Sequence, residues 1–520
     1  MKVAEVLSQL LARQGVTDVF GNPGTTELPF LEGVRQRYIL TLHDSIALGA
    51  ADGLAQISRG IAVANLHAAP GLGNSIGFLD SARRHHSPVL VTVGQQDLRH
   101  IDQDPLLHGD FESMVHGLVK YSHEVTSADE VGPVLARATR IALEPPMGPV
   151  LLSLPMNVME SEGKLPAAEP ASPTSFEEPM DAVVETVKAA AHPAIVAGYG
   201  VDQDDAFAEL AALSSALGAP VYGEPFCSRA PVPAALPEYA GDLLPAAALI
   251  DAALSEFDLV LLVGADLILY PYTPTPLLPH QRVAYLGSDP AVANKLHAVH
   301  AYGNLKRSLE LLRSKLSPTG RTFRPPADFG RANRVARSAR VMGGAFVLDA
   351  ARRAFPEHTV VDEAVSLTPT LKASGFYRGR DSYFAARSGQ LGWALSAAVG
   401  LGLRQPKLLA VVGDGALLYT AQALWTFSRY QIPVKTLVLN NGGYGILRSY
   451  SKAFHPSLTD AAYLQLPGVD IEALSKAYRV PSRSAGTPPE LDEGLVWLRD
   501  SEGPALLDVR IDPSVPDLFG

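Results

Sequence analysis

The sequence is poor in cysteine, in clustered positive charge and in long apolar stretches. Cys227 is the single cysteine among 520 residues, which excludes a disulfide framework and zinc or iron–sulfur sites built from several cysteines. Acidic residues outnumber basic ones, 54 against 43, and no run of five basic residues occurs, so we expect no binding to nucleic-acid phosphates. The longest apolar stretch, 259–270, is interrupted by Asp266 and is too short to cross a bilayer.

The first residues lack the unbroken apolar core of a signal peptide. Val3, Val6, Leu7, Leu10 and Leu11 recur instead at helical spacing, with polar residues between them. This pattern predicts an amphipathic helix. We therefore expect a cytoplasmic protein with no membrane partner.

Apolar residues make up 47% of the chain and occur mainly in short runs separated by longer helical patterns. Because the runs show no polar alternation, they indicate parallel strands that helices cover on both faces. They fall into three groups: 19–24, 62–71, 89–96 and 150–155; 194–200, 258–266 and 282–290; and 358–364, 407–415, 434–443 and 505–512. The predicted fold is α/β, with three doubly wound parallel-sheet domains.

Two proline-containing segments without periodicity separate these groups, at 159–180 and 314–333. Such segments are typical of interdomain linkers. We therefore expect domains at 1–160, 181–315 and 335–520. The similar layout of the first and third groups suggests an old duplication.

Two turns at the ends of predicted strands carry the strongest chemical signal. One is Gly413–Gly415, and the other, one helix and one strand later, is Asn440–Gly443. Adjacent parallel strands bring both turns to the carboxyl edge of the sheet, where ligands of open α/β sheets bind. The Asp414 carboxylate, the Asn441 amide and the Gly443 carbonyl offer oxygen ligands suited to Mg²⁺ shared with a diphosphate, and glycines let backbone N–H groups approach phosphate closely.

With these turns, the chain resembles the thiamine diphosphate (ThDP) enzymes. Within that family it looks most like the benzoylformate decarboxylases and, more broadly, like acetolactate synthases and other 2-oxoacid decarboxylases. The resemblance extends over the stretches 19–32, 51–59, 65–74, 87–96, 389–400 and 466–480. It implies pyrimidine-binding, middle and diphosphate-binding domains in that order, with ThDP and Mg²⁺ as cofactors. It also implies a homotetramer of two dimers, whose active sites lie between the first domain of one chain and the third of its neighbour.

The resemblance implies a set of cofactor contacts. Asp414, Asn441 and the Gly443 carbonyl match the family's metal ligands. Leu391 matches the apolar residue that holds the cofactor in its bent shape. The remaining expected cofactor contacts are Asp44, Asn74, Ser366, Gly389, Gly413, Gly415 and Tyr444.

Three polar residues of the first domain are expected to face the substrate. Thr25 matches the serine that holds the substrate carboxylate in benzoylformate decarboxylases, although it also suits the cap of a helix. His67 matches their catalytic histidine and ends a buried strand, where an imidazole can relay protons near neutral pH; a purely structural histidine is the alternative. Glu27 lies nearby by the same matching, or is a carboxylate in the first turn of a helix.

The sequence departs from the family pattern at Asp44. The matching residue in the family is a glutamate that hydrogen-bonds the aminopyrimidine ring of ThDP and so promotes loss of the proton from the thiazolium C2. The carboxylate remains at Asp44, but its side chain is one methylene shorter. The departure bears on how efficiently the cofactor would be activated.

A second departure is a missing histidine. Benzoylformate decarboxylases use one from the middle domain, but residues 264–276 contain none, and Pro271 or a neighbour takes its place. His108 is the first candidate to replace it. His85 and His86 are alternatives, although we expect that pair at a helix end with a surface face.

Residues after the second turn are expected to line the substrate pocket, namely Ile446, Leu447 and Tyr450. Ile446 stands where benzoylformate decarboxylases have a smaller side chain, so we expect a different pocket shape. Arg387 and Arg448 are candidates for recognising an acidic substrate, with ion-pair or surface roles as the alternative.

The function that the resemblance implies is decarboxylation of a 2-oxoacid to an aldehyde through an enamine intermediate. The alternative within the family is a carboligase that joins an aldehyde acceptor to give a 2-hydroxyketone or an acetolactate-type product. A non-catalytic member of the fold is less favoured, because the proposed metal ligands are intact. A NAD-dependent dehydrogenase is disfavoured, since no GxGxxG follows a predicted strand, and nothing in the sequence supports FAD.

Overall fold

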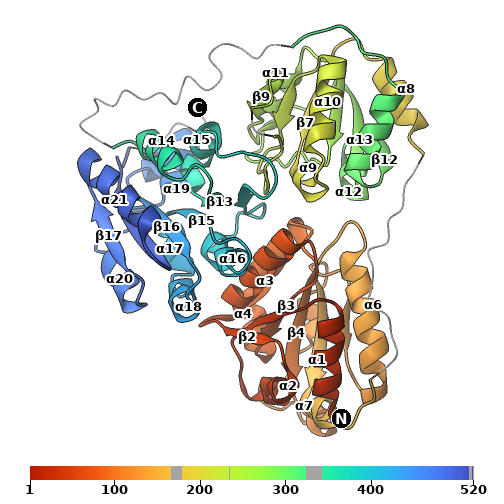
Figure 1. Ribbon diagram of the computed structural model, residues 1–520, viewed down its shortest axis with the longest axis vertical. Coiled ribbons are helices and arrows are strands. Elements are labelled where there is room, and N and C mark those ends of the chain that lie inside the picture. The colour runs from red at the N-terminus through yellow and green to blue at the C-terminus, as the bar shows by residue number, and fades with distance from the viewer. Residues whose placement is uncertain (166–178, 234, 324–341, 515–517, 519–520) are drawn as a thin grey trace.

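The computed structural model describes residues 1–165, 179–233, 235–323, 342–514 and 518. These residues form three α/β domains, each around a six-stranded sheet in which neighbouring strands are parallel (Figure 1). The predicted fold class is therefore confirmed. Much of the two predicted linkers, 166–178 and 324–333, lies outside the described residues.

The first domain has the strand order β2-β1-β3-β4-β6-β5. Its strands are β1 Asp18–Gly21, β2 Arg37–Leu40, β3 Ala62–Leu66, β4 Val89–Gln95, β5 Ser122–Glu124 and β6 Val150–Pro155. Its helices are α1 Val3–Arg13, α2 Leu28–Gly33, α3 Asp44–Ser58, α4 Ala68–Arg84, α5 Phe111–Met114, α6 Val131–Leu143 and α7 Met156–Glu160. The central strands are fully buried, as expected for a sheet with helices on both faces.

The middle domain has the order β12-β11-β10-β7-β8-β9, which is the strand order of dinucleotide-binding domains. Its strands are β7 Pro193–Ala197, β8 Val221–Gly223, β9 Tyr239–Asp242, β10 Leu259–Val263, β11 Arg282–Gly287 and β12 Val299–Tyr302. Its helices are α8 Asp181–Lys188, α9 Tyr199–Gln203, α10 Phe207–Leu217, α11 Ala247–Leu254, α12 Pro290–Lys295 and α13 Leu305–Ser314.

The third domain repeats the topology of the first, with the order β14-β13-β15-β16-β18-β17. Its strands are β13 Thr359–Glu363, β14 Tyr383–Ala385, β15 Leu408–Gly413, β16 Val434–Asn440, β17 Ser482–Ala485 and β18 Ala505–Arg510. Its helices are α14 Gly344–Ala354, α15 Thr368–Ala373, α16 Trp393–Gly402, α17 Asp414–Tyr419, α18 Ala423–Tyr430, α19 Gly445–Phe454, α20 Ile471–Ala477 and α21 Pro488–Asp500. The shared order agrees with the similar layout seen in the sequence.

The N-terminal amphipathic helix is confirmed as α1, which buries its apolar face against α2 and α6. Its apolar residues belong to one of the cores of the first domain. Among the described residues, no helix combines the length and the apolar character needed to cross a membrane.

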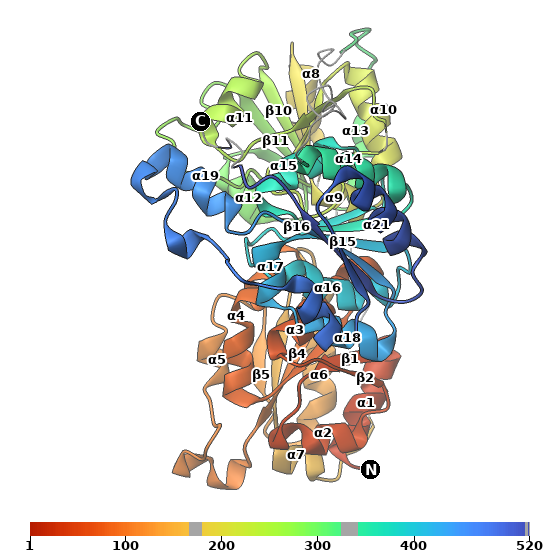
Figure 2. The same cartoon turned by 90° about the vertical axis from the view of Figure 1, so that its left-hand side faces the viewer.

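The first and third domains meet through α3 and α16, which lie side by side (Figures 1 and 2). Glycines make this close approach possible. A Cβ at Gly400 would lie 1.9 Å from the Ala50 oxygen, and a Cβ at Gly53 would lie 2.3 Å from the Ala397 oxygen. Larger residues at either glycine would push the two domains apart.

A buried ion-pair network joins all three domains. Asp202 of the middle domain pairs with Arg229 at 2.7 Å and with Arg59 of the first domain at 2.9 Å. Arg229 also pairs with Asp381 of the third domain at 2.7 Å. Breaking one partner of a buried pair leaves an uncompensated charge, so this network holds the domains in one relative placement.

Candidate active site

The predicted site residues gather at two topological switch points, where the strand order of a sheet reverses and ligands of α/β folds bind. In the third domain the order reverses between β13 and β15. In the first domain it reverses between β1 and β3. Each switch point carries one half of the predicted site.

Asp414 lies at the start of α17 and is 5% exposed. Burial raises the pKa of its carboxyl to about 6, while the backbone N–H groups of Gly415, Gly442 and Gly443 act in the opposite direction. The two glycine turns predicted from the sequence therefore meet around this carboxylate. A buried carboxylate with a raised pKa favours a nearby cation, which would stabilise its charged form.

Asn441, Ser366 and Tyr444 lie close to this carboxylate turn. The Gly443 N–H donates to the Asn441 Oδ1 at 3.2 Å. Ser366 Oγ and Asn441 Nδ2 both lie against Gly445, where a Cβ would come within 3.0 and 2.7 Å of them. The Tyr444 ring covers Gly415, because a Cβ added to Gly415 would lie 2.9 Å from the ring. These residues form one continuous wall beside Asp414.

Three loop glycines around this wall face open space. A Cβ added to Gly389, Gly413 or Gly442 would meet no atom within 4 Å. Backbone groups of these turns are therefore accessible to a ligand. Among the described residues no group of three or more His, Cys, Asp or Glu side chains is placed to hold a metal, so a cation here would take one carboxylate, amide and carbonyl oxygens, and phosphate oxygens. That donor set fits Mg²⁺ bound together with a diphosphate.

The loop 387–392 borders the same space and carries Leu391, which is half-buried. Glu363, at the carboxyl end of β13, caps the helix that follows this loop. Its carboxylate accepts the N–H groups of Gly392 at 2.5 Å and Ala394 at 2.9 Å. Burial raises the pKa of Glu363 to about 8. The sequence analysis missed this residue, although an acidic residue that ends a predicted strand was a usable signal.

In the first domain, His67 and Glu27 form a pair. Nδ1 of His67 lies 2.7 Å from Glu27 Oε2, and Glu27 is 1% exposed. The N–H groups of Gly24 and Gly94 also donate to Glu27, at 2.8 and 3.1 Å. Glu27 is therefore fixed on all sides and orients the imidazole. Thr25 is exposed on the same loop.

Asp44 begins α3, is 5% exposed and touches the same loops. Its Oδ1 accepts the backbone N–H of His67 at 3.1 Å, and its Oδ2 lies 3.4 Å from Asn22 Nδ2. A Cβ at Gly71 would come within 2.4 Å of Asp44 Oδ1, so α4 packs directly on the carboxylate. The structure thus brings Asp44, Glu27 and His67 together at one edge.

Two other predicted residues of the first domain lie on α4 and on the loop before α5. Asn74 is exposed on α4. His108 is half-buried and its Nδ1 lies 3.2 Å from Asp104. Its neighbour Gly109 packs against Ala69, at the start of α4, where a Cβ would come within 2.9 Å. His108 therefore belongs to a loop that reaches the His67 region but is itself paired elsewhere.

The expectation of a surface face for His85 and His86 is wrong. The His85 side chain is 0% exposed and pairs with Asp52 at 2.7 Å. His86 stacks on Tyr199 with ring centroids 5.1 Å apart, and burial lowers its pKa to about 3. Both histidines are enclosed between domains, because α4 ends at an interface rather than in solvent.

The two arginines proposed for an acidic substrate make internal contacts. Arg387 is 5% exposed and pairs with Glu224 at 3.3 Å. Arg448 donates to the Pro513 oxygen at 3.0 Å. These contacts favour the structural alternative for both residues.

The predicted pocket residues lie on α19. Ile446 and Tyr450 are half-buried, and Leu447 is 47% exposed. The ring of Tyr450 lies 6.0 Å from that of Tyr270, in the middle-domain segment that lacks the family's histidine. The middle domain therefore reaches α19 with an aromatic side chain at this point.

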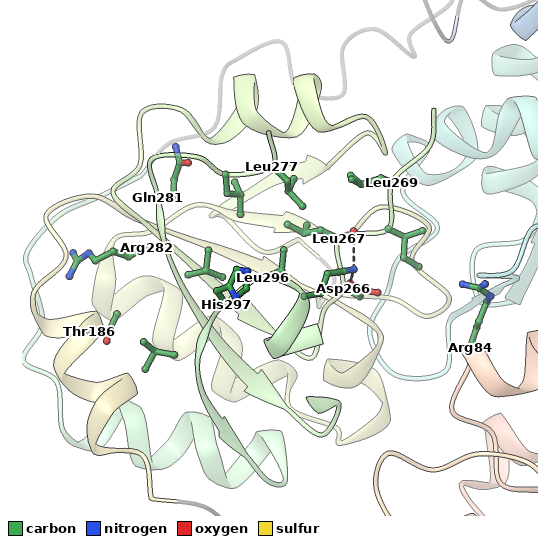
Figure 3. A pocket seen from close by; sticks show the side chains of 15 residues that line it. Arg84, Thr186, Asp266, Leu267, Leu269, Leu277, Gln281, Arg282, Leu296 and His297 are labelled. Carbon is green, nitrogen blue, oxygen red and sulfur yellow. Dashed lines mark hydrogen bonds and ion pairs between the residues drawn. The ribbon is translucent and has the colours of Figure 1, made fainter. Parts of the chain in front are cut away.

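A cavity of about 720 Å³ lies elsewhere, in the middle domain (Figure 3). Its lining combines leucine, isoleucine and valine side chains with polar and charged ones, and it contains none of the predicted site residues. Its cationic side chains are already paired, Lys295 with Asp266 and Arg282 with Asp258. We therefore place the candidate active site at the two switch points and not in this cavity.

Three models of the thiamine pyrophosphate enzyme family match the chain: the N-terminal TPP binding domain at residues 1–118, the central domain at 180–312 and the C-terminal TPP binding domain at 369–509. Thiamine pyrophosphate is another name for ThDP. The chain belongs to this family.

Benzoylformate decarboxylases and acetolactate synthases are among its relatives. Benzoylformate decarboxylase of Pseudomonas aeruginosa is 33% identical over 516 residues, covering 96% of this chain and 97% of the relative. The acetolactate synthase isozyme 2 large subunit of Escherichia coli is 26% identical, covering 98% and 96%. A 4-hydroxybenzoylformate decarboxylase structure from Rhodococcus jostii RHA1 superposes with a TM-score of 0.91 at 32% identity, covering 99% of this chain and 100% of that one. The protein is a ThDP-dependent enzyme related to benzoylformate decarboxylases and acetolactate synthases.

Proposed function

We propose that the protein is a ThDP- and Mg²⁺-dependent decarboxylase of a 2-oxoacid, and that it acts on an arylglyoxylate such as benzoylformate. The observation that carries this proposal is the joint presence of the Asp414 turn and the Glu27–His67 pair at the switch points of two sheets. The first suits a metal diphosphate, and the second suits proton transfer. The relatedness to benzoylformate decarboxylases supports the choice of substrate class.

In this proposal the third domain holds the cofactor. Asp414, the Asn441 amide oxygen and the Gly443 carbonyl hold Mg²⁺, and the turn N–H groups and Ser366 contact the diphosphate. Leu391 packs against the bound cofactor. When bound, ThDP supplies a carbon nucleophile and an electron sink for decarboxylation.

The first domain handles protons. Glu27 accepts a hydrogen bond from the Nδ1–H of His67. Nε2 is then the ring atom that exchanges a proton with the substrate. Asp44 would contact the aminopyrimidine when ThDP is bound, and Thr25 would offer a hydroxyl to the substrate carboxylate. The backbone N–H of His67 donates to Asp44 Oδ1 at 3.1 Å. This hydrogen bond fixes the position of Asp44 relative to His67.

We further propose that active sites form between two copies of the chain, within a homotetramer. Large apolar side chains adjoin both halves of the site and are exposed in the single chain, namely Leu28 at 58%, Leu42 at 41% and Tyr419 at 53%. A second copy that covers them would exclude water from the site. An exposed apolar surface of this kind is typical of an interface.

Carboligation is the second candidate. The segment 264–276 contributes Tyr270 and no histidine at the edge of α19, so the protein offers fewer proton donors there. Slower protonation would leave more time for attack on an acceptor aldehyde. The acetolactate synthase relatives favour the same possibility.

The test is to incubate the purified enzyme, ThDP and Mg²⁺ with benzoylformate, 4-hydroxybenzoylformate and pyruvate, each with and without benzaldehyde or acetaldehyde. We expect CO₂ and the aldehyde from the aryl substrates, with a requirement for both cofactors. If a 2-hydroxyketone forms with an acceptor present and no aldehyde forms without one, the result favours carboligation over simple decarboxylation. No CO₂ and no ligation product from any of them would refute both.

A further inference from the structure

The loop 387–392 is anchored by first-domain side chains that no proposed catalytic step uses. Ser388 Oγ lies 2.7 Å from Ser81 Oγ on α4. A Cβ at Gly77, also on α4, would lie 2.0 Å from the Gln390 Oε1. The backbone N–H of Arg387 donates to His85 Nε2 at 3.0 Å, just after the end of α4.

Of these three contacts, the one to His85 continues into a buried carboxylate, that of Asp52. Asp52 on α3 is 0% exposed, and its Oδ2 accepts both from His85 Nδ1 at 2.7 Å and from Trp393 Nε1 at 2.7 Å. Trp393 is the first residue of α16, directly after the loop. Asp52 therefore holds the two ends of the 387–392 loop, one through His85 and one through Trp393.

The hydrogen bonds of His85 determine which of its two ring nitrogens carries the proton. Although burial acts in the other direction, His85, Ser87 and Trp393 hold the pKa of Asp52 below its usual range, so its carboxylate is charged and accepts. His85 must then donate from Nδ1, which leaves Nε2 without a proton and able to accept the Arg387 N–H. A side chain without an acceptor at that position would leave a buried N–H unsatisfied.

We propose that Asp52 and His85 are positioning residues that fix the 387–392 loop, so that Leu391 and Gly389 meet ThDP in the productive geometry. This inference rests on the proposed function, in which that loop contacts the cofactor. His85 acts through the loop and touches neither cofactor nor substrate. Its role is to link the first domain to the cofactor-binding face of the third.

The experiment compares His85→Leu with His85→Gln, which have similar volume but differ in whether an oxygen can accept the Arg387 N–H. Ser87→Ala is the matched control, because Ser87 also donates to Asp52, at 2.5 Å, and is equally buried, but is not connected to the loop. ThDP affinity is measured by calorimetry with Mg²⁺, and hydrogen–deuterium exchange at the ThDP C2 is measured at saturating cofactor. Trp393→Phe, which removes the donor to Asp52 together with part of the buried ring system, replaces His85→Leu if that variant does not fold.

We expect His85→Leu to slow C2 exchange by about 10- to 100-fold, the scale of a misplaced reacting group, with His85→Gln recovering most of the rate and Ser87→Ala unchanged. Trp393→Phe should slow exchange by about 10-fold. Exchange in His85→Leu equal to that in Ser87→Ala would overturn the proposal, as would equal losses in the Leu and Gln variants. A parent enzyme that does not bind ThDP would instead refute the proposed function, so the two failures are distinguishable.

Discussion

The switch points of the middle and third sheets differ in what fills them. In the third domain, Gly389, Gly413 and Gly442 face open space. In the middle domain, Gly198 and Gly264 pack on each other's loops, and a Cβ at Gly198 would lie 2.5 Å from the Gly264 oxygen. Both sheets are parallel and doubly wound, but of these two switch points only that of the third domain has glycines facing open space.

Glu224 fills the middle switch point. Its carboxylate accepts the Tyr199 N–H at 2.9 Å and the Asp266 N–H at 2.6 Å, and it pairs with Arg387 of the third domain. In dinucleotide-binding folds such N–H groups bind phosphate. Here an internal carboxylate occupies that role, so strand order alone does not predict nucleotide binding. The lack of a GxGxxG motif agrees with this.

The largest expected effect comes from removing the anchor of the open crevice. Asp414→Ala should abolish ThDP binding at ordinary Mg²⁺, because it removes the only charged protein ligand proposed for the cation. Calorimetry with ThDP and Mg²⁺ checks this. Asp470→Ala, which removes a helix cap in the same domain, should leave affinity unchanged, and parent-like affinity in Asp414→Ala would contradict the metal assignment.

His67→Ala tests whether the first switch point is functional in the same way. Turnover should fall by about 10²–10⁴-fold, the size of a general acid–base contribution, with ThDP affinity nearly unchanged. Steady-state kinetics and calorimetry separate the two. Glu27→Gln should lose less, and exposed His116→Ala should lose nothing. Unchanged turnover in His67→Ala would make this histidine structural.

Glu224→Ala should open the switch point of the middle domain, which the Glu224 side chain fills in the parent. Arg387 would be left as a buried unpaired charge, at a cost of about 3–5 kcal/mol in unfolding free energy. Phosphate should then stabilise the variant more than the parent, because it would bind the freed N–H groups and the guanidinium. Denaturant unfolding with and without phosphate measures both effects, and exposed Glu185→Ala is the control. Equal phosphate effects in variant and parent would count against this account of the crevice.

Glu363→Gln should change the pH dependence of stability. Burial raises the pKa of Glu363 from 4.5 to about 8. Between these values the folded protein holds a proton that the unfolded chain has released, so stability falls as pH rises, by at most about 1.4 kcal/mol per pH unit. Urea unfolding of cofactor-free protein at pH 5, 6.5 and 8 should show a shallower slope in the variant. The same slope in both, with exposed Glu493→Gln as reference, would mean that Glu363 does not titrate there.

The central strands were predictable because each is a continuous apolar run, as in β4 and β10. The seven strands that the sequence analysis missed, β2, β5, β8, β9, β12, β14 and β17, are three or four residues long and lie at or next to sheet edges. Edge strands such as β2 and β17 are partly exposed and keep polar residues. Over only four residues, such a mixed pattern cannot be distinguished from that of a loop.

The two turns of the third domain were predictable because each is a local motif. The pairs that shape the site were not, because their members lie far apart in sequence. Glu27 and His67 are separated by 40 residues, and Glu224 and Arg387 by 163. Sequence spacing alone gave no reason to pair them, and the burial of His85 likewise depends on packing between domains.

The ion-pair network at the three-domain junction limits how this enzyme can be recombined with its relatives. The carboxylate of Asp202 serves arginines from two domains, and Asp381 from the third completes the set. A chimera that receives a foreign middle domain would keep Arg59 and Asp381 but lose their partners Asp202 and Arg229. Exchange of the middle domain therefore requires that Arg59, Asp202, Arg229 and Asp381 be transferred as one unit.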